Sequence, residues 1–162
     1  MLKEYDIIVV GAGHAGNEAA ASAAKMGSSV LLITMNMETI GQMSCNPAIG
    51  GVAKGQIVRE IDALGGLTGI ITDLSAIQYK LLNKSKGPAM WSPRAQCDRK
   101  LFSSAWRNKL EEINNLDFWQ DVVKEVVVKK GKAVGVKTSM GIEIRSKAVI
   151  LNSGTFLNGP IH

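Results

Sequence analysis

The sequence has few of the residues that mark secreted, membrane-spanning or metal-binding proteins. Its 162 residues include only two cysteines, too few for the disulfide framework of a small secreted domain. The two histidines and two cysteines stand far apart, so no set has metal-site spacing and we predict no metal. No apolar run reaches the 18 residues of a membrane-spanning helix, and residues 1–4 lack a signal-peptide layout. We therefore expect a cytoplasmic protein without a membrane partner.

Acidic residues are scarce in one part of the chain. The formal net charge is +5, yet the segment 80–109 holds eight cations and a single acid, Asp98. A concentrated basic segment favours a polyanionic partner such as a nucleic acid. A solvated basic helix face explains the same charges, and the sequence leaves both interpretations open. The cations are Lys80, Lys84, Lys86, Arg94, Arg99, Lys100, Arg107 and Lys109.

Glycine, by contrast, is plentiful where the chain begins. The β-branched run Ile7–Val10, within the segment 5–10, predicts a buried parallel strand, and Gly-Ala-Gly-His-Ala-Gly follows it directly at 11–16. In a dinucleotide-binding βαβ unit, the glycine at position 11 permits the tight turn and that at 13 lets the backbone approach a pyrophosphate. The glycine at 16 lets the next helix pack closely on the strand. The alternative is a glycine-rich turn in an ordinary α/β protein.

The next strand does not settle which dinucleotide binds. An Asp or Glu that holds the ribose is expected about 20 residues after the turn, at the end of the second strand. Residues 29–34 form that predicted strand, but it ends in Thr34, and the nearest acid is Glu38. Thr34 or Asn36 offers a hydrogen bond to a ribose hydroxyl instead. The choice between FAD and NAD therefore stays open from this unit alone.

The rest of the chain predicts a Rossmann-like α/β fold. We expect helices at 15–26, 56–64 and 94–113, partly helical structure at 67–84, and a long irregular stretch at 35–54. Alternating strands at 122–130, 133–138 and 141–145 precede a buried strand at 147–151. We interpret this as one FAD/NAD(P)-binding domain over 1–162, with a parallel sheet and an antiparallel β-meander inserted at about 117–146.

A second glycine-rich loop, at 41–51, carries the candidate nucleophile Cys45. Small and turn-forming residues surround Cys45, which favours exposure, and Lys54 and Arg59 lie near enough in sequence to favour a thiolate. The alternative is a small packing residue. Cys97 falls in a predicted helix, and we expect it in the core because free cysteine is among the most buried residue types.

Several blocks of the sequence together match one family. They are Val-Gly-Ala-Gly-His-Ala-Gly at 10–16, Gly-Gln-Met-Ser-Cys-Asn-Pro-Ala-Ile-Gly-Gly at 41–51, and Lys-Gly at 54–55. Further blocks lie at 62–66, 82–89, 94–99 and 154–157. On these residues the chain resembles the N-terminal part of the MnmG (GidA) family of FAD-dependent tRNA uridine 5-carboxymethylaminomethyl modification enzymes. Members of that family are several-fold longer.

The resemblance implies a cofactor, a partner and a reaction. FAD would place its pyrophosphate at Gly11, Ala12, Gly13, His14, Ala15 and Gly16, and the backbone of Val123 would contact its adenine side. Cys45 matches a cysteine that the reaction requires. The substrate would be the wobble uridine of certain tRNAs, modified at C5 together with the GTPase MnmE. Methylene-tetrahydrofolate would supply the carbon, and NADH would reduce the flavin.

Three other functions remain open at this point. One is another FAD-dependent oxidoreductase, another is a folate-dependent tRNA uracil methyltransferase, and the block around Cys45 argues against both. The third is a non-catalytic FAD-binding fragment, because the later parts of the family sequence do not occur in these 162 residues.

Overall fold

The structure is a computed structural model that describes residues 3–43 and 46–154. The chain divides into two compact units, which are described separately. The first unit comprises residues 1–40 and 109–162, and the second comprises residues 41–108. The predicted single domain over 1–162 stays a prediction.

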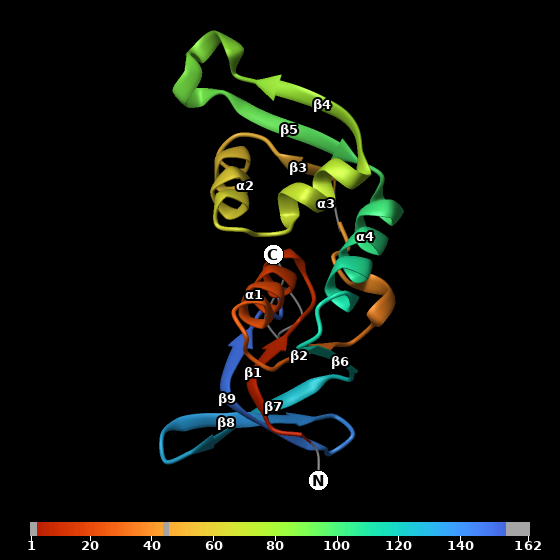
Figure 1. Ribbon diagram of the computed structural model, residues 1–162, viewed down its shortest axis with the longest axis vertical. Helices are drawn as coiled ribbons and strands as arrows, with labels where there is room; N and C mark the ends of the chain where they lie inside the picture. Colours follow the sequence, from red (N-terminus) through yellow and green to blue (C-terminus); the bar gives the residue numbers. More distant parts are fainter. Residues whose placement is uncertain (1–2, 44–45, 155–162) are drawn as a thin grey trace, which may run out of the picture. The chain divides into compact units, whose positions relative to one another are not determined.

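The first unit is built on one six-stranded sheet with the order β6-β2-β1-β9-β8-β7 (Figure 1). The four strands β6, β2, β1 and β9 run parallel to one another, and β8 and β7 continue the sheet in antiparallel pairing. The predicted Rossmann-like sheet with an antiparallel extension is therefore confirmed. The strands are β1 Tyr5–Val10, β2 Val30–Thr34, β6 Leu116–Gln120, β7 Val123–Lys129, β8 Lys132–Thr138 and β9 Glu143–Leu151.

Helix α1, His14–Lys25, connects β1 to β2 and packs on the sheet through a face of small residues. Ala20, Ala21 and Ala24 are buried on this face, and the absence of longer side chains lets the helix axis approach the strands. Val9 and Leu32, which are register partners in β1 and β2, are completely buried. The short 3₁₀ helix η1, Met37–Thr39, follows β2.

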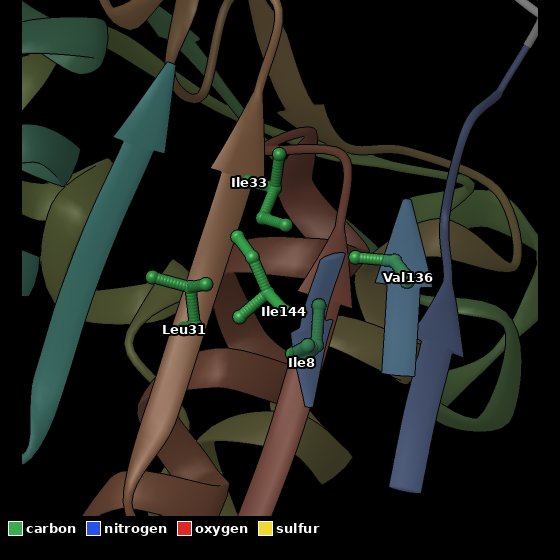
Figure 2. Packing of buried hydrophobic residues seen from close by; sticks show 5 residues of the cluster. All are labelled: Ile8, Leu31, Ile33, Val136 and Ile144. Atoms are coloured by element: carbon green, nitrogen blue, oxygen red, sulfur yellow. The ribbon is translucent and has the colours of Figure 1, made fainter. Parts of the chain in front are cut away.

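A cluster of buried side chains packs the parallel strands against the antiparallel extension. Ile8, Leu31 and Ile33 come from β1 and β2, while Val136 and Ile144 come from β8 and β9 (Figure 2). Because side chains alternate along a strand, Ile8 and Leu31 point to the face opposite Val9 and Leu32. The sheet is thus buried on both faces, which explains the continuous apolar runs of β1 and β2.

The last strand differs from the sequence prediction. We expected one strand at 141–145 and a second at 147–151, but β9 runs unbroken from Glu143 to Leu151. Its first part pairs antiparallel with β8, and from Ser146 onward it pairs parallel with β1. No Gly or Pro interrupts this stretch, so nothing in the chain ends the strand. The predicted start of the inserted meander was also early, because β6 belongs to the parallel sheet.

The second unit has a three-stranded antiparallel sheet with the order β3-β5-β4. Helices α2 and α3 contact one another, and both contact β5. The helix α4, Arg99–Glu111, begins in this unit and ends in the first. The other elements are β3 Ala48–Gly50, α2 Lys54–Ala63, α3 Thr68–Ser75, β4 Ala76–Leu82, η2 Lys84–Lys86, η3 Pro88–Met90 and β5 Ser92–Cys97.

Two of the predicted helical segments were partly wrong, because parts of them form the β4–β5 hairpin. The stretch 67–84 is helical only to Ser75, and the predicted helix 94–113 begins at Arg99 because 92–97 form β5. Proline normally argues against a central strand, since it has no N–H to donate. Here β3 pairs only as far as Gly50 with Arg94, so Pro93 lies beyond its end. Cys97 is buried as predicted, but in β5 rather than in a helix.

Candidate functional site

The predicted phosphate turn lies at the carboxyl edge of the parallel strands. It joins the end of β1 to the start of α1, and β9 ends beside it, because the N–H of Asn152 donates to the carbonyl of Val10 at 2.8 Å. The chain continues from β1 to β2 on one side, whereas the neighbour on the other side, β9, comes much later. Ligands of open α/β sheets bind outside the carboxyl ends of the strands at this kind of reversal point.

Gly11 turns the chain out of the strand. Its φ is +102°, a conformation that side-chain-bearing residues rarely adopt, and its N–H donates to the carbonyl of Ile33 in β2 at 2.8 Å. A Cβ at this position would stand 2.1 Å from the carbonyl oxygen of Asn152. Both the conformation and the space therefore require glycine, as the sequence predicted for the tight turn.

Gly16 lets α1 lie directly against this turn. A Cβ there would stand 1.9 Å from the carbonyl oxygen of Gly11 and 2.9 Å from the side-chain nitrogen of Asn152. Those distances are far below van der Waals contact, so any larger residue would push the helix away from the strand. The predicted role of the third glycine, close helix–strand packing, is confirmed.

Gly13 differs from the other two glycines. Its φ of −73° and ψ of −178° are open to any residue, and a Cβ would meet only the side-chain nitrogen of Asn152, at 3.6 Å. The fold itself therefore does not require glycine here. Gly13 is exposed, and the surface that a side chain would cover is the outer face of the turn. Close approach of a ligand explains the glycine where packing does not.

The helix terminus makes this outer face attractive to an anion. No side chain caps α1 at Gly13, and the first turn of the helix contains no acidic residue. The N–H groups of a helix terminus and the helix dipole favour negative charge at such a place. His14 is the first residue of α1 and is half-buried, and Ala15 beside it is exposed. The residues that are present thus fit a pyrophosphate, the part of FAD that the sequence assigned to 11–16.

The two residues predicted to offer a hydrogen bond to the ribose, Thr34 and Asn36, lie at and just after the end of β2. The N–H of Asn36 lies 3.4 Å from the hydroxyl oxygen of Thr34, and the side-chain oxygen of Asn36 accepts the N–H of Glu38 at 2.9 Å. Asn36 thus forms the N-cap of η1 and shapes the loop. Thr34 itself is largely buried. Asn36 is exposed, and so is the nearest acid, Glu38, in the loop that follows β2.

Val123 lies close to the same loop. The N–H of Asp121 donates to the carbonyl of Thr34 at 3.0 Å, and the side-chain oxygen of Gln120 accepts the N–H of Met37 at 3.2 Å. The segment that leads from β6 to Val123 therefore runs beside the end of β2. The side chain of Val123 is partly buried and packs against the core cluster. The predicted backbone contact to the adenine side fits this placement and stays a prediction.

Asn152 is the site residue that the sequence argument missed. Its carbonyl lies under Gly11 and its side-chain nitrogen beside Gly16 and Gly13, so it contacts the turn from the sheet side. The sequence did show a polar residue directly after the predicted last strand. Only the pairing of β9 with β1, however, brings that residue next to the first glycine.

The candidate nucleophile Cys45 falls outside the described residues. The loop that follows it is well anchored, since the N–H of Cys97 donates to the carbonyl of Pro47 at 2.7 Å. The Lys54 ammonium lies 3.4 Å from the carbonyl oxygen of Ala48, in β3. Burial raises the pKa of the Cys97 thiol, which keeps that cysteine protonated. Cys97 is thus an inert core residue, and the role of Cys45 stays a prediction.

The structure describes the ranges 3–43 and 46–154. They contain no group of three or more His, Cys, Asp or Glu residues placed to hold a metal ion. Within the same ranges, no helix has the length and apolar character needed to cross a membrane.

The chain is similar to several proteins of known name or structure. The tRNA uridine 5-carboxymethylaminomethyl modification enzyme MnmG of Cytophaga hutchinsonii is 67% identical over 162 residues, all of this chain and 26% of its own length. The structure of Aquifex aeolicus GidA superposes with a TM-score of 0.94 at 51% identity, covering 96% of this chain and 26% of that one. The flavin-dependent brominase Bmp2, at 23% identity and a TM-score of 0.66, shares the fold over 94% of this chain and 39% of its own.

The chain thus spans about a quarter of the length of the relatives that it matches. The family model described as glucose inhibited division protein A matches residues 6–162, which include the phosphate turn, the loop of Cys45 and all of β9. Family and fold together support FAD as the dinucleotide for the turn. This chain belongs to the glucose inhibited division protein A family.

Proposed function

We propose that this chain is the FAD-binding part of an enzyme that modifies C5 of the wobble uridine in certain tRNAs. The observation that carries the proposal is Gly13, which the fold does not require and whose open outer face lies at the uncapped terminus of α1. Membership of the family and the name of the Cytophaga hutchinsonii relative support the tRNA substrate. The family resemblance supports the GTPase MnmE as partner, NADH as reductant and methylene-tetrahydrofolate as carbon donor.

Each part of the site has one task in this proposal. Bound FAD supplies the redox chemistry on the transferred one-carbon unit. The turn 11–16 binds the pyrophosphate, Asn152 supports the turn from below, and the loop after β2 receives the ribose. The backbone of Val123 contacts the adenine side.

Cys45 prepares the uridine in the same proposal. C5 of uridine is a poor nucleophile until a group adds to C6. The thiolate of Cys45 forms a bond to C6, and the electron pair of the C5–C6 double bond then makes C5 nucleophilic. C5 then forms a bond to the transferred one-carbon unit. When the C5 proton leaves, its electron pair re-forms the C5–C6 double bond, and the C6–S bond breaks to release the thiolate. The cysteine is therefore regenerated after each turnover.

The FAD part of the proposal is tested on the 162-residue chain by titration with FAD, with quenching of flavin fluorescence as the signal. Saturable binding that is lost in Gly13→Leu supports an FAD site at this turn. Ser22→Leu is the matched control, because Ser22 is exposed on α1 two turns away from the phosphate turn. Equal FAD binding by Gly13→Leu and Ser22→Leu would overturn the assignment.

Turnover needs the remaining three quarters of a family member. A chimera in which this chain replaces the matching 26% of the Cytophaga hutchinsonii relative supplies them. Expressed in a strain without its own enzyme, the chimera should restore the modified wobble uridine, measured by mass spectrometry of tRNA nucleosides. Cys45→Ser should abolish the modification while the purified chimera still holds FAD. Full modification by Cys45→Ser would exclude the proposed role of the thiol.

A further inference from the structure

The β4–β5 hairpin of the second unit carries positive charge without any acid. We call residues 76–97 the arm and residues 83–91 the tip of the arm (Figure 1). Between Leu74 and Cys97 the sequence contains no Asp or Glu. It contains four cations, which are Lys80, Lys84, Lys86 and Arg94. The arm thus has a formal charge of +4, and the nearest acids, Asp73 and Asp98, lie at its base.

Two of these cations face one another across the hairpin. Lys80 and Arg94 are direct register partners in the antiparallel ladder of β4 and β5, so their side chains leave the same face of the sheet. Like charges at directly opposed positions destabilise a strand pair. An arm that keeps this pair gains stability when an anion lies between the two cations.

The tip is a folded turn rather than an open loop. Asn83 has a φ of +59° and Gly87 a φ of +88°, and each starts a short 3₁₀ turn. Backbone hydrogen bonds close both turns, from the N–H of Lys86 to Asn83 at 2.9 Å and from the N–H of Met90 to Gly87 at 3.0 Å. The side chains of the tip are therefore presented from a defined backbone.

Trp91 closes the tip with its ring held in place. The indole N–H donates to the carbonyl of Lys84 at 3.2 Å, which places the ring edge against the lysine-bearing turn. Even so, 42% of the Trp91 side chain is exposed. An exposed indole normally costs hydrophobic free energy, whereas an aromatic ring in a basic segment is an arrangement on which nucleic-acid bases stack.

We propose that the tip of the arm is a docking surface for an unpaired RNA loop. Trp91 stacks on one exposed base, and Lys84 and Lys86 neutralise the phosphates on either side. Lys80 and Arg94 hold a further phosphate farther down the arm. The partner is single-stranded because base faces are hidden inside a duplex. The inference rests on the proposed function, in which the substrate is a uridine in a tRNA loop, and it adds where that loop is held.

The stacking step is tested by fluorescence anisotropy of a labelled RNA stem-loop titrated with the 162-residue chain. Trp91→Ala should weaken binding about fivefold to a hundredfold. Trp91→Phe keeps a ring but loses the N–H, and should recover most of the affinity. Tyr79→Ala is the control, because Tyr79 is also exposed but its hydroxyl donates to Asp73 at the base of the arm, at 2.8 Å. An equal loss in Tyr79→Ala would overturn the assignment to the tip.

The predicted phosphate contacts of Lys84 and Lys86 are tested by salt dependence, with two lysines of a second hairpin of the same chain as the control. Lys84→Gln with Lys86→Gln should lower the slope of log affinity against log salt by about 0.7 per lysine. Lys130→Gln with Lys132→Gln removes the same charge from the exposed β7–β8 turn, which has no aromatic residue, and should leave affinity within about twofold. Equal effects of the two pairs would show that only net charge matters, and would overturn the proposal.

The outcomes also separate this inference from the proposed function. Tight binding of a fully paired duplex, or of polyglutamate with the same sensitivity to Trp91→Ala, would overturn an RNA loop as the occupant. Circular dichroism of each variant shows whether it is folded. If Trp91→Ala binds RNA normally while the chimera still modifies tRNA, the docking surface is wrong and the proposed function stands. If the chimera modifies no tRNA but the stem-loop binding still depends on Trp91, the proposed function fails alone.

Discussion

The carbonyl oxygen of Gly11 occupies the space in which a side chain of Gly16 would begin, with only 1.9 Å between that oxygen and the position of a Cβ. The turn and the helix it starts therefore touch backbone to backbone. Asn152 completes the contact, since its side-chain nitrogen would stand 2.9 Å from the same Cβ. Gly16 allows the helix to pack against the turn, whereas Gly13 leaves space on the outer face of the turn.

This difference separates two substitutions that look alike in sequence. Gly16→Ala should lower the free energy of unfolding by about 1–3 kcal/mol, because the Cβ forces the helix from the strand. Gly13→Leu should leave stability within about 0.5 kcal/mol, the usual range for an exposed site, yet weaken FAD binding tenfold or more, about 1.4 kcal/mol. Urea unfolding and FAD titration of both variants measure the two effects. A stable Gly16→Ala would contradict the close contact.

A substitution at Asn152 can test the effect of charge on FAD binding while the size of the side chain stays the same. Asn152→Asp replaces an amide by a carboxylate of the same size, so the backbone hydrogen bond to Val10 should persist. The new negative charge lies next to the turn that we propose binds the pyrophosphate. FAD affinity should fall about tenfold or more, and added salt should recover part of it. Asn152→Ala, which lacks the charge, should lose less, and the reverse order would exclude electrostatic repulsion.

Ile144 joins the antiparallel extension to the parallel strands. Its side chain is 1% exposed and packs in the cluster with Ile8 and Leu31 (Figure 2). Ile144→Ala should lower the free energy of unfolding by about 2–5 kcal/mol, as large-to-small changes in a core do. Val128→Ala is the control, since Val128 is 58% exposed and should change stability little. Chemical unfolding curves with equal slopes would give the difference directly.

Asp121 makes the first unit sensitive to acid. Hydrogen bonds from the hydroxyl of Ser139 and from the N–H groups of Val122 and Met140 lower the pKa of Asp121 from 3.8 to about 2. Because the folded pKa is depressed, the carboxylate contributes its full stabilisation above pH 4. That stabilisation is lost as the pH falls from about 4 toward 2.

The measurement compares melting temperatures of the native chain and Asp121→Asn from pH 5 to pH 2. The native chain should be more stable at pH 5, and the two curves should converge toward pH 2. Curves that stay parallel over this range would mean that Asp121 does not titrate as described.

The two cysteines should react differently with a thiol reagent. Cys97 is 1% exposed, and burial raises its pKa, so its thiol should label only when the chain unfolds. Any thiol that reacts quickly in the native chain should therefore be Cys45. Mass spectrometry after brief alkylation checks this, with Cys45→Ser as the comparison. Rapid labelling of Cys97 in native buffer would contradict its place in the core.

The sequence predicted the part of the fold that depends on local patterns. The apolar runs of β1 and β2 and the three glycines between them predict a strand, a turn and a helix from neighbouring residues alone. The hairpin at Lys130 and Gly131 is local in the same way. Long-range partners were harder, because no pattern near Asn152 shows that β9 will lie beside β1.

The arm shows a different reason for failure. The short alternation Ile-Gln-Tyr-Lys at 77–80 of β4 fits a strand, but α3 precedes it directly and no Gly or Pro marks the boundary, so part of the stretch 67–84 suits a helix. Arg94, Ala95 and Gln96 likewise suit a helix, and only their pairing with Lys80, Tyr79 and Gln78 makes them a strand. For Cys45 the sequence predicts a reactive thiol. Because Cys45 falls outside the described residues, only a chemical experiment tests that prediction.

The position of Asn152 has a consequence for the timing of biosynthesis. The glycines of the turn leave the ribosome well before Asn152, the residue that follows β9 and supports them. At synthesis rates of about 5–20 residues per second, the interval lasts on the order of ten to thirty seconds. During that time the nascent chain contains the turn 11–16 but lacks both β9 and Asn152, which contact it in the folded structure. The proposed FAD site is therefore complete only when synthesis has passed Asn152.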